Sequence, residues 1–502
     1  MINMNKVLDL ISRFELFLKA KKGLRIVLLS VILFNAFLYV KTDYKKIPEI
    51  QARKDAAGFS PDKAYRFIYF YYYLNQFPLA TLNGDLDYSE EGAKNEIKNR
   101  PNDLIMEYMH WSRLGESARI LAYMPNALVK GSPENPSIKL FNSLLFVAGL
   151  LVLFIGFWRI KKPLFGLLLL ILINCTPFFI YEVYCRDNIF GLMASSFFIV
   201  LGLNLPFLFS KSINYFKYVI VAIISGALVG FFSEFRNEVS VVIVSLLLIY
   251  ILSSSIRWAP KIIYVLVVLF CFNASKTMIR YHFSLKFEQT MHLVGNHGGH
   301  IYNGPRLSGH NFWHPVFCGL GDFDTKYGYQ WYDVIAYQYA IPILQKEYGM
   351  DINYSGGYIT NDYYDDHRLY YKKPEELPNY EKVVKKKVID DIKNDPVWYI
   401  TIIFKRIART LTTTIPVSYV GWLLFPLVYF LYKRKNWQDL KLILVALPLS
   451  ATSIIVHSGK GTTYNSLFVY FILVIIMAQG YNFYKNKMNT GKENLIQKET
   501  EK

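Results

Sequence analysis

Lys139-Leu-Phe-Asn-Ser-Leu-Leu-Phe-Val-Ala-Gly-Leu-Leu-Val-Leu-Phe-Ile-Gly-Phe-Trp158 is a mostly apolar stretch, and the basic residues Arg159-Ile-Lys-Lys162 follow it directly. About 20 apolar residues are the length at which a helix crosses the hydrocarbon of a bilayer. Lys and Arg gather at the cytoplasmic end of such helices. Similar apolar blocks of about 16 to 22 residues recur along the chain, so the pattern predicts an all-α polytopic membrane protein.

Composition supports the same class. The 502 residues are 53% hydrophobic and 17% aromatic, with a net charge of +18. The Lys and Arg residues lie largely between the apolar blocks and at the termini, as the positive-inside rule expects. We therefore interpret the charge as a topology signal and expect no nucleic-acid partner. The four cysteines form neither a disulfide framework nor a CxxC metal motif.

The basic connections predict about ten transmembrane helices with both termini in the cytoplasm. The predicted spans are 24–41, 139–158, 163–181, 188–209, 218–233, 239–254, 262–275, 417–432, 440–456 and 466–484. Seven regions follow: a cytoplasmic amphipathic leader (1–23), the first span (24–41), a first extracytoplasmic loop (42–137), spans 2 to 7 (138–275), a large extracytoplasmic segment (276–416), spans 8 to 10 (417–484) and a cytoplasmic tail (485–502). We expect short helices and irregular structure in the two extracytoplasmic segments.

Residues 398–413 are ambiguous. They form a moderately apolar run that contains Arg406 and Arg409, which favours an interfacial helix on the outer face. If this run crossed the membrane instead, every later assignment of sides would invert.

Short turns at the predicted outer rim carry charge between apolar blocks. Ionisable groups at such a boundary are costly unless they are paired, solvated or functional. One interpretation is two turns with self-paired charges, and the other is a polar cleft in which Arg binds phosphate and Asp acts as a base or a cation ligand. The rim residues are Glu182, Arg186, Asp187, Glu234, Arg236, Glu238, His457, Lys460 and Tyr464.

The stretch from His310 to Asp333 lies in the longest polar segment and combines His, Trp, Asp and Gly. Such a mixture is poor at forming a simple helix or strand. Trp313 and Trp331 suit stacking on a sugar face, whereas the imidazoles and carboxylate suit hydrogen bonds to hydroxyls. His310 and His314 have i,i+4 spacing, but Asn311 stands where a zinc-protease motif needs Glu, so the sequence predicts no metal ligands here.

Asp62 is the acidic residue of interest in the first outer loop. Ser60-Pro-Asp62 predicts a helix start, with Ser60 as the N-cap and Asp62 in the first turn. Asp62 has a purely structural alternative, because a carboxylate is favoured at a helix N-terminus.

Together these features resemble the GT-C class of membrane glycosyltransferases, and are similar to its bacterial protein mannosyltransferase and aminoarabinose transferase group. The matching elements are Asp62-Lys-Ala-Tyr65 after the first span, Arg186-Asp187, Arg236-Asn-Glu238 and the His310–Asp333 stretch. The chain lacks a sequence like the WWDYG of oligosaccharyltransferases, which counts against transfer of a whole glycan to Asn.

The resemblance implies sugar transfer from a polyprenyl-phosphate donor to a glycan, lipid or protein acceptor outside the plasma (inner) membrane. Asp62 would be the base and Asp187 a second acid; Arg186, Arg236 and Lys460 would bind the donor phosphate. The residues expected to contact substrate are His310, Trp313, His314, Trp331, Asp333, Glu238, His457 and Tyr464. A divalent cation is the one candidate cofactor. The alternatives are a polymerase or ligase of lipid-linked glycans and a transporter, which should have broken or polar spans.

Overall fold

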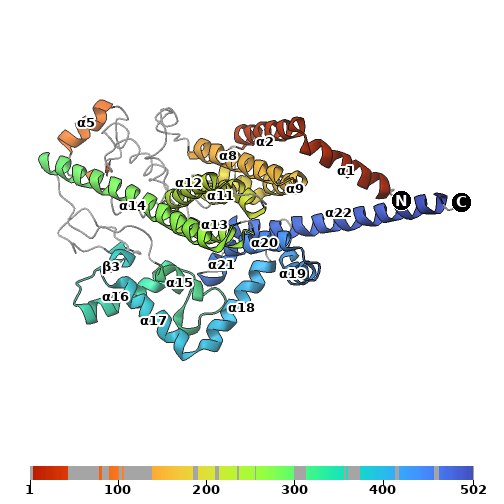
Figure 1. Ribbon diagram of the computed structural model, residues 1–502. Helices are drawn as coiled ribbons and strands as arrows, with labels where there is room; N and C mark the ends of the chain where they lie inside the picture. The colour runs from red at the N-terminus through yellow and green to blue at the C-terminus, as the bar shows by residue number, and fades with distance from the viewer. Residues whose placement is uncertain are drawn as a thin grey trace.

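The structure, a computed structural model, is almost entirely helical where it is described (Figure 1). It describes residues 4–42, 79–81, 90–100, 104–106, 138–184, 190–209, 214–234, 237–254, 256–298, 312–355, 358–359, 374–412, 418–456 and 463–500. Two separate apolar cores are present, one in a bundle of long helices and one in a smaller unit formed within residues 313–412.

The bundle consists of apolar helices of very different lengths, and two long segments of the chain separate α2 from α8 and α14 from α19. Its helices are α2 (Lys21–Lys41), α8 (Ile138–Arg159), α9 (Pro163–Asn174), α10 (Pro177–Tyr184), α11 (Phe190–Phe209), α12 (Tyr215–Ser233), α13 (Val241–Leu252), α14 (Trp258–Asn296), α19 (Leu424–Lys433), α20 (Trp437–Ala446), α21 (Ala451–Ile455) and α22 (Thr463–Thr500). Short 3₁₀ turns precede or join some of them: η4 (Asn237–Ser240), η7 (Val420–Leu423) and η8 (Leu447–Ser450).

Among the residues that the structure describes, six helices are long and apolar enough to cross a membrane, which agrees with the predicted all-α membrane fold. A seventh span results if the bent pair α9–α10 counts as one. Three further predicted spans correspond to shorter apolar helices, within 193–209, 238–252 and 420–433. The count of ten therefore stays a prediction.

The smaller unit, which we call the segment unit, forms one compact layer beside the bundle (Figure 1). It comprises α15 (Trp313–Leu320), η5 (Lys326–Gly328), α16 (Asp333–Tyr348), the antiparallel pair β3 (Tyr354–Ser355) and β4 (Tyr358–Ile359), η6 (Pro374–Glu376), α17 (Tyr380–Asn394) and α18 (Pro396–Thr412). We call the bundle end next to this unit the segment end. The opposite end, where α1 (Met4–Lys19) lies, is the leader end.

The described part of the first loop is small. It contains α5 (Glu90–Asn99) and one antiparallel pair, β1 (Leu79–Thr81) with β2 (Leu104–Met106), in which Ala80 lies opposite Ile105.

Glycines let the bundle helices approach backbone to backbone. A Cβ on Gly202 of α11 would lie 2.3 Å from the Val152 carbonyl oxygen of α8, and one on Gly156 would lie 2.5 Å from the Gly202 oxygen. Gly226 and Gly230 bring α12 equally close to α14. Small residues are the usual means of close packing in membranes, where lipid removes the hydrophobic drive between helices.

Polar contacts tie the leader end together. Lys162 Nζ lies 2.7 Å from Asp439 Oδ1, which joins the α8–α9 turn to α20. Nearby in the bundle, Asn204 donates to Ser225 Oγ at 2.7 Å and accepts from the Tyr250 hydroxyl at 2.8 Å, so one amide links α11, α12 and α13.

Four expectations need correction. Span 3 is a pair of helices bent by 67° at Cys175–Thr176, because Pro177 begins a new helix. Helix α14 continues past residue 275 to Asn296, since its polar half holds no Gly or Pro before Gly295. Helix α22 likewise continues through the predicted tail to Thr500. Within the His310–Asp333 stretch, Trp313–Leu320 is a regular helix with Pro315 in its first turn, where Pro is tolerated.

Candidate functional site

The described residues that sequence analysis assigned to the site fall into two groups. Trp313, His314, Trp331 and Asp333 belong to the segment unit, and Glu238 and Tyr464 lie at the segment end of the bundle. The remaining predicted site residues lie outside the described residues: Asp62, Arg186, Asp187, Arg236, His310, His457 and Lys460.

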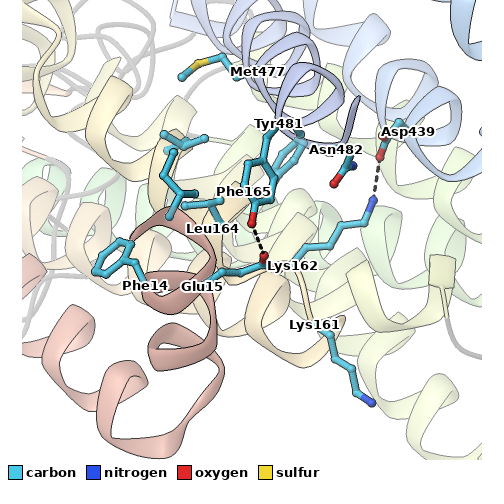
Figure 2. A pocket seen from close by; sticks show the side chains of 13 residues that line it. Phe14, Glu15, Lys161, Lys162, Leu164, Phe165, Asp439, Met477, Tyr481 and Asn482 are labelled. Carbon is cyan, nitrogen blue, oxygen red and sulfur yellow. Dashed lines mark hydrogen bonds and ion pairs between the residues drawn. The ribbon is translucent and has the colours of Figure 1, made fainter. Parts of the chain in front are cut away.

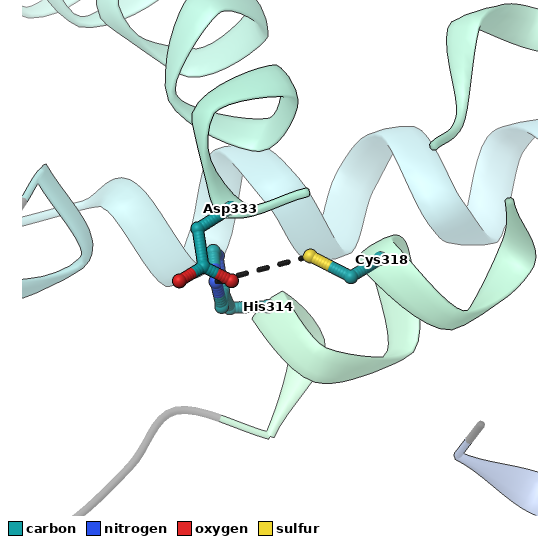
Figure 3. Close-up of side chains that lie close together, drawn as sticks. All are labelled: His314, Cys318 and Asp333. Atoms are coloured by element: carbon teal, nitrogen blue, oxygen red, sulfur yellow. Dashed lines mark hydrogen bonds and ion pairs between the residues drawn. The ribbon is translucent and has the colours of Figure 1, made fainter. Parts of the chain in front are cut away.

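His314 is the centre of a polar cluster in the segment unit, part of which Figure 3 shows. Its Nδ1 lies 2.7 Å from the Tyr380 hydroxyl. Its Nε2 lies 3.3 Å from Asp333 Oδ1, 3.4 Å from Glu375 Oε2 and 3.9 Å from Cys318 Sγ. The structure thus brings together His314 and Asp333, two of the residues that sequence analysis proposed for substrate contact, and adds Tyr380, Glu375 and Cys318.

Two carboxylates, those of Asp333 and Glu375, face the buried imidazole of His314 in this cluster, so their negative charges strongly affect its pKa. Burial alone lowers the pKa of His314, but hydrogen bonds to Asp333 and Cys318 and the charge of Glu375 raise it to about 10. Burial also raises the pKa of the Tyr380 phenol, which keeps this hydroxyl neutral. The Nε2 side of the ring therefore requires a positive charge at neutral pH.

Helix α15 is held in place by a carboxylate from another helix. Glu381 Oε1 of α17 accepts the Trp313 backbone N–H at 2.7 Å and so caps the N-terminus of α15 across 68 positions of sequence. Burial raises the pKa of Glu381, and backbone N–H groups at the start of α15 oppose that shift. The cap fixes the direction from which His314 and, one turn later, Cys318 enter the cluster.

The two predicted tryptophans have different environments. Trp313 is half-buried, and Lys385 Nζ lies over its ring at 5.5 Å from the centroid. Trp331 is 47% exposed, two residues before Asp333. Trp331 is therefore the more accessible of the two to a ligand from solvent.

Buried polar side chains gather at the segment end, where α8, α10, α11 and α22 meet. Glu182 of α10 is 3% exposed, next to the stretch that holds Arg186 and Asp187. Tyr464 is also buried, with its hydroxyl 3.2 Å from Ser196 Oγ, so it packs in the bundle. Other buried polar residues near these helix ends are Asn142, Ser143, Ser195, Asn465 and Ser466.

Glu234, at the predicted mouth of spans 5 and 6, is paired across helices. Arg280 Nε of α14 lies 3.1 and 3.0 Å from its two carboxylate oxygens, and Lys276 Nζ lies 3.6 Å from one of them. The interpretation of paired charges therefore accounts for Glu234. Its partners come from α14, however, and not from the same turn. Glu238 lies in η4, one turn further on.

Arg406 is a fully buried residue that sequence analysis placed only in an interfacial helix. Its Nε donates to Asp322 Oδ2 at 3.1 Å, and Nη1 donates to the carbonyls of Ile454 and Ile455 at 3.2 and 2.9 Å. Nη2 is buried without a hydrogen-bond partner among the described residues. Arg406 joins the segment unit to the end of α21, directly before the His457–Tyr464 turn.

A cavity of about 420 Å³ lies at the leader end (Figure 2). Its wall is largely apolar, with Phe14 and Phe165 on one side and the Lys162–Asp439 pair on the other. Glu15 accepts a hydrogen bond from the Tyr481 hydroxyl at 3.2 Å there. None of the predicted site residues that the structure describes lines this cavity, so it is separate from the segment end.

Comparison of the chain with protein-family models, curated proteins and solved structures gives no match in any of the three. The class that the fold supports is an all-α protein with several helices able to cross a membrane.

Proposed function

We propose that the chain is a plasma-membrane glycosyltransferase. In this proposal it moves a sugar from a polyprenyl phosphate to an acceptor hydroxyl at the segment end, on the outer side. The observation that carries the proposal is Glu182, a buried carboxylate in α10, the short helix that ends at Tyr184 in an otherwise apolar bundle. Ionisable groups within membrane helices are costly and mark substrate paths.

The proposed chemistry is a direct displacement. A carboxylate, Asp62 or Asp187, takes the proton of the acceptor hydroxyl, and the acceptor oxygen attacks the anomeric carbon with inversion. The bond from that carbon to the phosphate oxygen breaks, and polyprenyl phosphate leaves with the electron pair. Arg186, Arg236 and Lys460 would stabilise the phosphate charge. A polymerase or ligase of lipid-linked glycans would use the same groups with a glycan acceptor.

The segment unit would recognise the acceptor or the sugar. It contacts the bundle through Arg406, whose carbonyl partners Ile454 and Ile455 lie just before His457 in the sequence. Its exposed Trp331 offers an aromatic face two residues before the exposed carboxylate of Asp333, and such a pair of side chains would suit a sugar ring.

A transporter is the second candidate because of one observation. The α9–α10 pair is broken, and a buried amide pair lies beside the break, with Asn35 donating to Asn174 Oδ1 at 2.9 Å. The Tyr184 hydroxyl completes this group by donating to Asn35. Discontinuous helices with polar groups at the break are typical of transporter binding sites.

A transfer assay separates these candidates. Full-length protein in proteoliposomes would be given a panel of polyprenyl-phosphate sugars, and wild type would be compared with Asp62→Asn, Asp187→Asn and Glu182→Gln. Asp9→Asn, on the exposed face of α1, is the matched control. Loss of the base should reduce transfer by about 10²- to 10⁴-fold, whereas the control should keep it.

Full transfer by both Asp variants would remove the catalytic assignment. Products that grow by repeated units would identify a polymerase. Uptake of labelled sugar into the vesicles without any transfer would favour the transporter.

A further inference from the structure

We propose that His314, Cys318, Asp333 and Glu375 form a structural zinc site in the segment unit. His314, Cys318 and Asp333 present ligand atoms that all lie within 4.8 Å of one another, and Figure 3 shows the three side chains pointing toward one another. Glu375 Oε2 faces the same imidazole nitrogen at 3.4 Å. This inference does not depend on the proposed transferase activity.

The distances around Nε2 fit a metal better than a shared proton. A charged N–H donating to a carboxylate usually lies about 2.7–2.9 Å from the oxygen. Here the two carboxylate oxygens lie 3.3 and 3.4 Å from Nε2. Zinc bonds of roughly 2.0–2.1 Å at tetrahedral angles would place a nitrogen and an oxygen ligand about 3.3 Å apart.

The thiol fits the same centre. Cys318 Sγ lies 3.9 Å from Nε2, slightly beyond the roughly 3.6 Å that a 2.3 Å Zn–S bond would give. His314 and Cys318 are four residues apart on α15, so both side chains leave the same face of the helix. One nitrogen, one sulfur and two carboxylate oxygens form a ligand set suited to zinc.

The surroundings of His314 also suit a metal ligand. Its Nδ1 lies 2.7 Å from the buried Tyr380 hydroxyl, so a proton on Nδ1 can be donated there while the Nε2 lone pair turns toward the cluster. Ligating histidines almost always have such a partner on the other ring nitrogen. Zinc would displace the proton from Nε2 and release the thiol proton of Cys318, because ligands bind deprotonated.

Four protein ligands leave no open position, which is typical of a structural site. The ligands come from α15, from the first residue of α16 and from η6, which precedes α17. Zinc would therefore fasten together three elements around the core of the segment unit. The Asp333 side chain is 58% exposed, which gives the ion a path from solvent.

The test uses full-length protein in detergent, purified without a His tag, freed of metal with a chelator and then given Zn²⁺ alone. Elemental analysis should find one zinc per chain in wild type and in Cys271→Ser, a matched control in α14. With Co²⁺ instead, both proteins should show a thiolate-to-cobalt charge-transfer band that Cys318→Ser lacks. Tyr380→Phe should bind zinc about 10- to 100-fold more weakly.

Two outcomes of the measurements on wild type and Cys318→Ser would overturn the site. One is a wild-type protein that takes up no stoichiometric zinc, in which case a proton on His314 balances the two carboxylates. The other is a cobalt–thiolate band that survives Cys318→Ser. If Cys318→Ser does not fold, Asp333→Asn and Glu375→Gln replace it in the test. Both variants should bind zinc more weakly and still show the cobalt–thiolate band. Unchanged zinc affinity in both variants would reject the site.

Discussion

Arg406 Nε of α18 lies 3.1 Å from Asp322 Oδ2, and neither side chain is more than 8% exposed. This ion pair sits where the segment unit meets the bundle, because the same guanidinium also donates to two carbonyls at the end of α21. Burial lowers the pKa of Arg406, and the charge of Asp322 opposes that shift. Because both charges are desolvated, the stability of this ion pair depends on the geometry of the hydrogen bonds between its partners.

Replacement of Arg406 by Met should detach the segment unit from the bundle. The variant keeps the apolar stem but leaves Asp322 as a buried charge, which costs about 3–5 kcal/mol when a buried pair is broken. Hydrogen exchange of full-length protein should show faster exchange in α18 and α21. Lys405→Met, one residue earlier on an exposed face, is the control, with an expected effect within about 0.5 kcal/mol.

The double variant Arg406→Met with Asp322→Asn should recover part of the loss, because no buried charge is left unpaired. Equal destabilisation by Arg406→Met and Lys405→Met would contradict the role of this pair.

Sequence analysis predicted the membrane helices well because apolar length and basic flanks are local signals. The block at 139–158 corresponds to α8, and the one at 24–41 to α2. The predicted helix end was wrong where a helix continues beyond its apolar part, as in α14. Residues 276–294 contain no Gly or Pro that would end this helix. Sequence analysis also missed the break at Pro177, which an unbroken apolar run conceals.

The candidate site was predicted only in part because its contacts are long-range. His314 and Asp333 stood out by residue type, and the structure places them 3.3 Å apart. Glu375 and Tyr380 come from a stretch more than 60 residues away in a different element, so no spacing rule connects them to His314. The sequence signal that could have indicated part of this cluster is the i,i+4 spacing of His314 and Cys318 on one helix.

Glycine-to-alanine substitutions should distinguish glycines at close helix–helix contacts from glycines with open space around them. A Cβ on Gly202 would meet the Val152 carbonyl oxygen at 2.3 Å, so Gly202→Ala must push α11 away from α8. We expect a loss of about 1–3 kcal/mol, the usual cost of overpacking, measured by thermal unfolding in detergent.

The matched control is Gly480→Ala in α22, where an added Cβ meets nothing within 4 Å. Ala is favoured over Gly inside a helix by about 1 kcal/mol, so this variant should be neutral or stabilised. If Gly202→Ala were as stable as Gly480→Ala, the close approach of α8 and α11 would be wrong.

The Glu234–Arg280 pair should respond asymmetrically to mutation. The Glu234 side chain is fully buried whereas that of Arg280 is 43% exposed. Arg280→Gln therefore weakens the compensation of a buried charge, but Glu234→Gln frees an arginine that can turn toward water. We expect a loss of roughly 1–3 kcal/mol for Arg280→Gln, between the values for exposed and buried pairs.

Glu234→Gln should cost less than Arg280→Gln in the same unfolding measurement. Lys276→Gln should cost under about 1 kcal/mol, because its ammonium is 3.6 Å from the carboxylate and partly solvated. The opposite order of the first two variants would show that the buried carboxylate is compensated by other groups.

The start of α18 should loosen in acid. Asp395 accepts from Lys326 Nζ at 2.6 Å and caps α18 by accepting the Trp398 N–H at 3.0 Å. The Lys326 hydrogen bond is the main cause that lowers the pKa of Asp395. A carboxyl whose pKa is lower in the folded state stabilises it above the unfolded pKa of about 3.9, and this contribution disappears as pH falls through the folded value.

The same contact raises the pKa of Lys326, so its contribution is complete below the unfolded lysine pKa of about 10.4 and is lost as pH rises further. The pair thus stabilises the α17–α18 junction across neutral pH and fails at both extremes. The protection of the first-turn amides of α18 against hydrogen exchange, relative to the intrinsic rate at each pH, should fall below about pH 4 in wild type. Asp395→Asn keeps a capping oxygen but carries no charge, so the protection of the same amides should already be lower at neutral pH and change little on acidification. An equal acid response in both proteins would assign the loosening to other carboxyls.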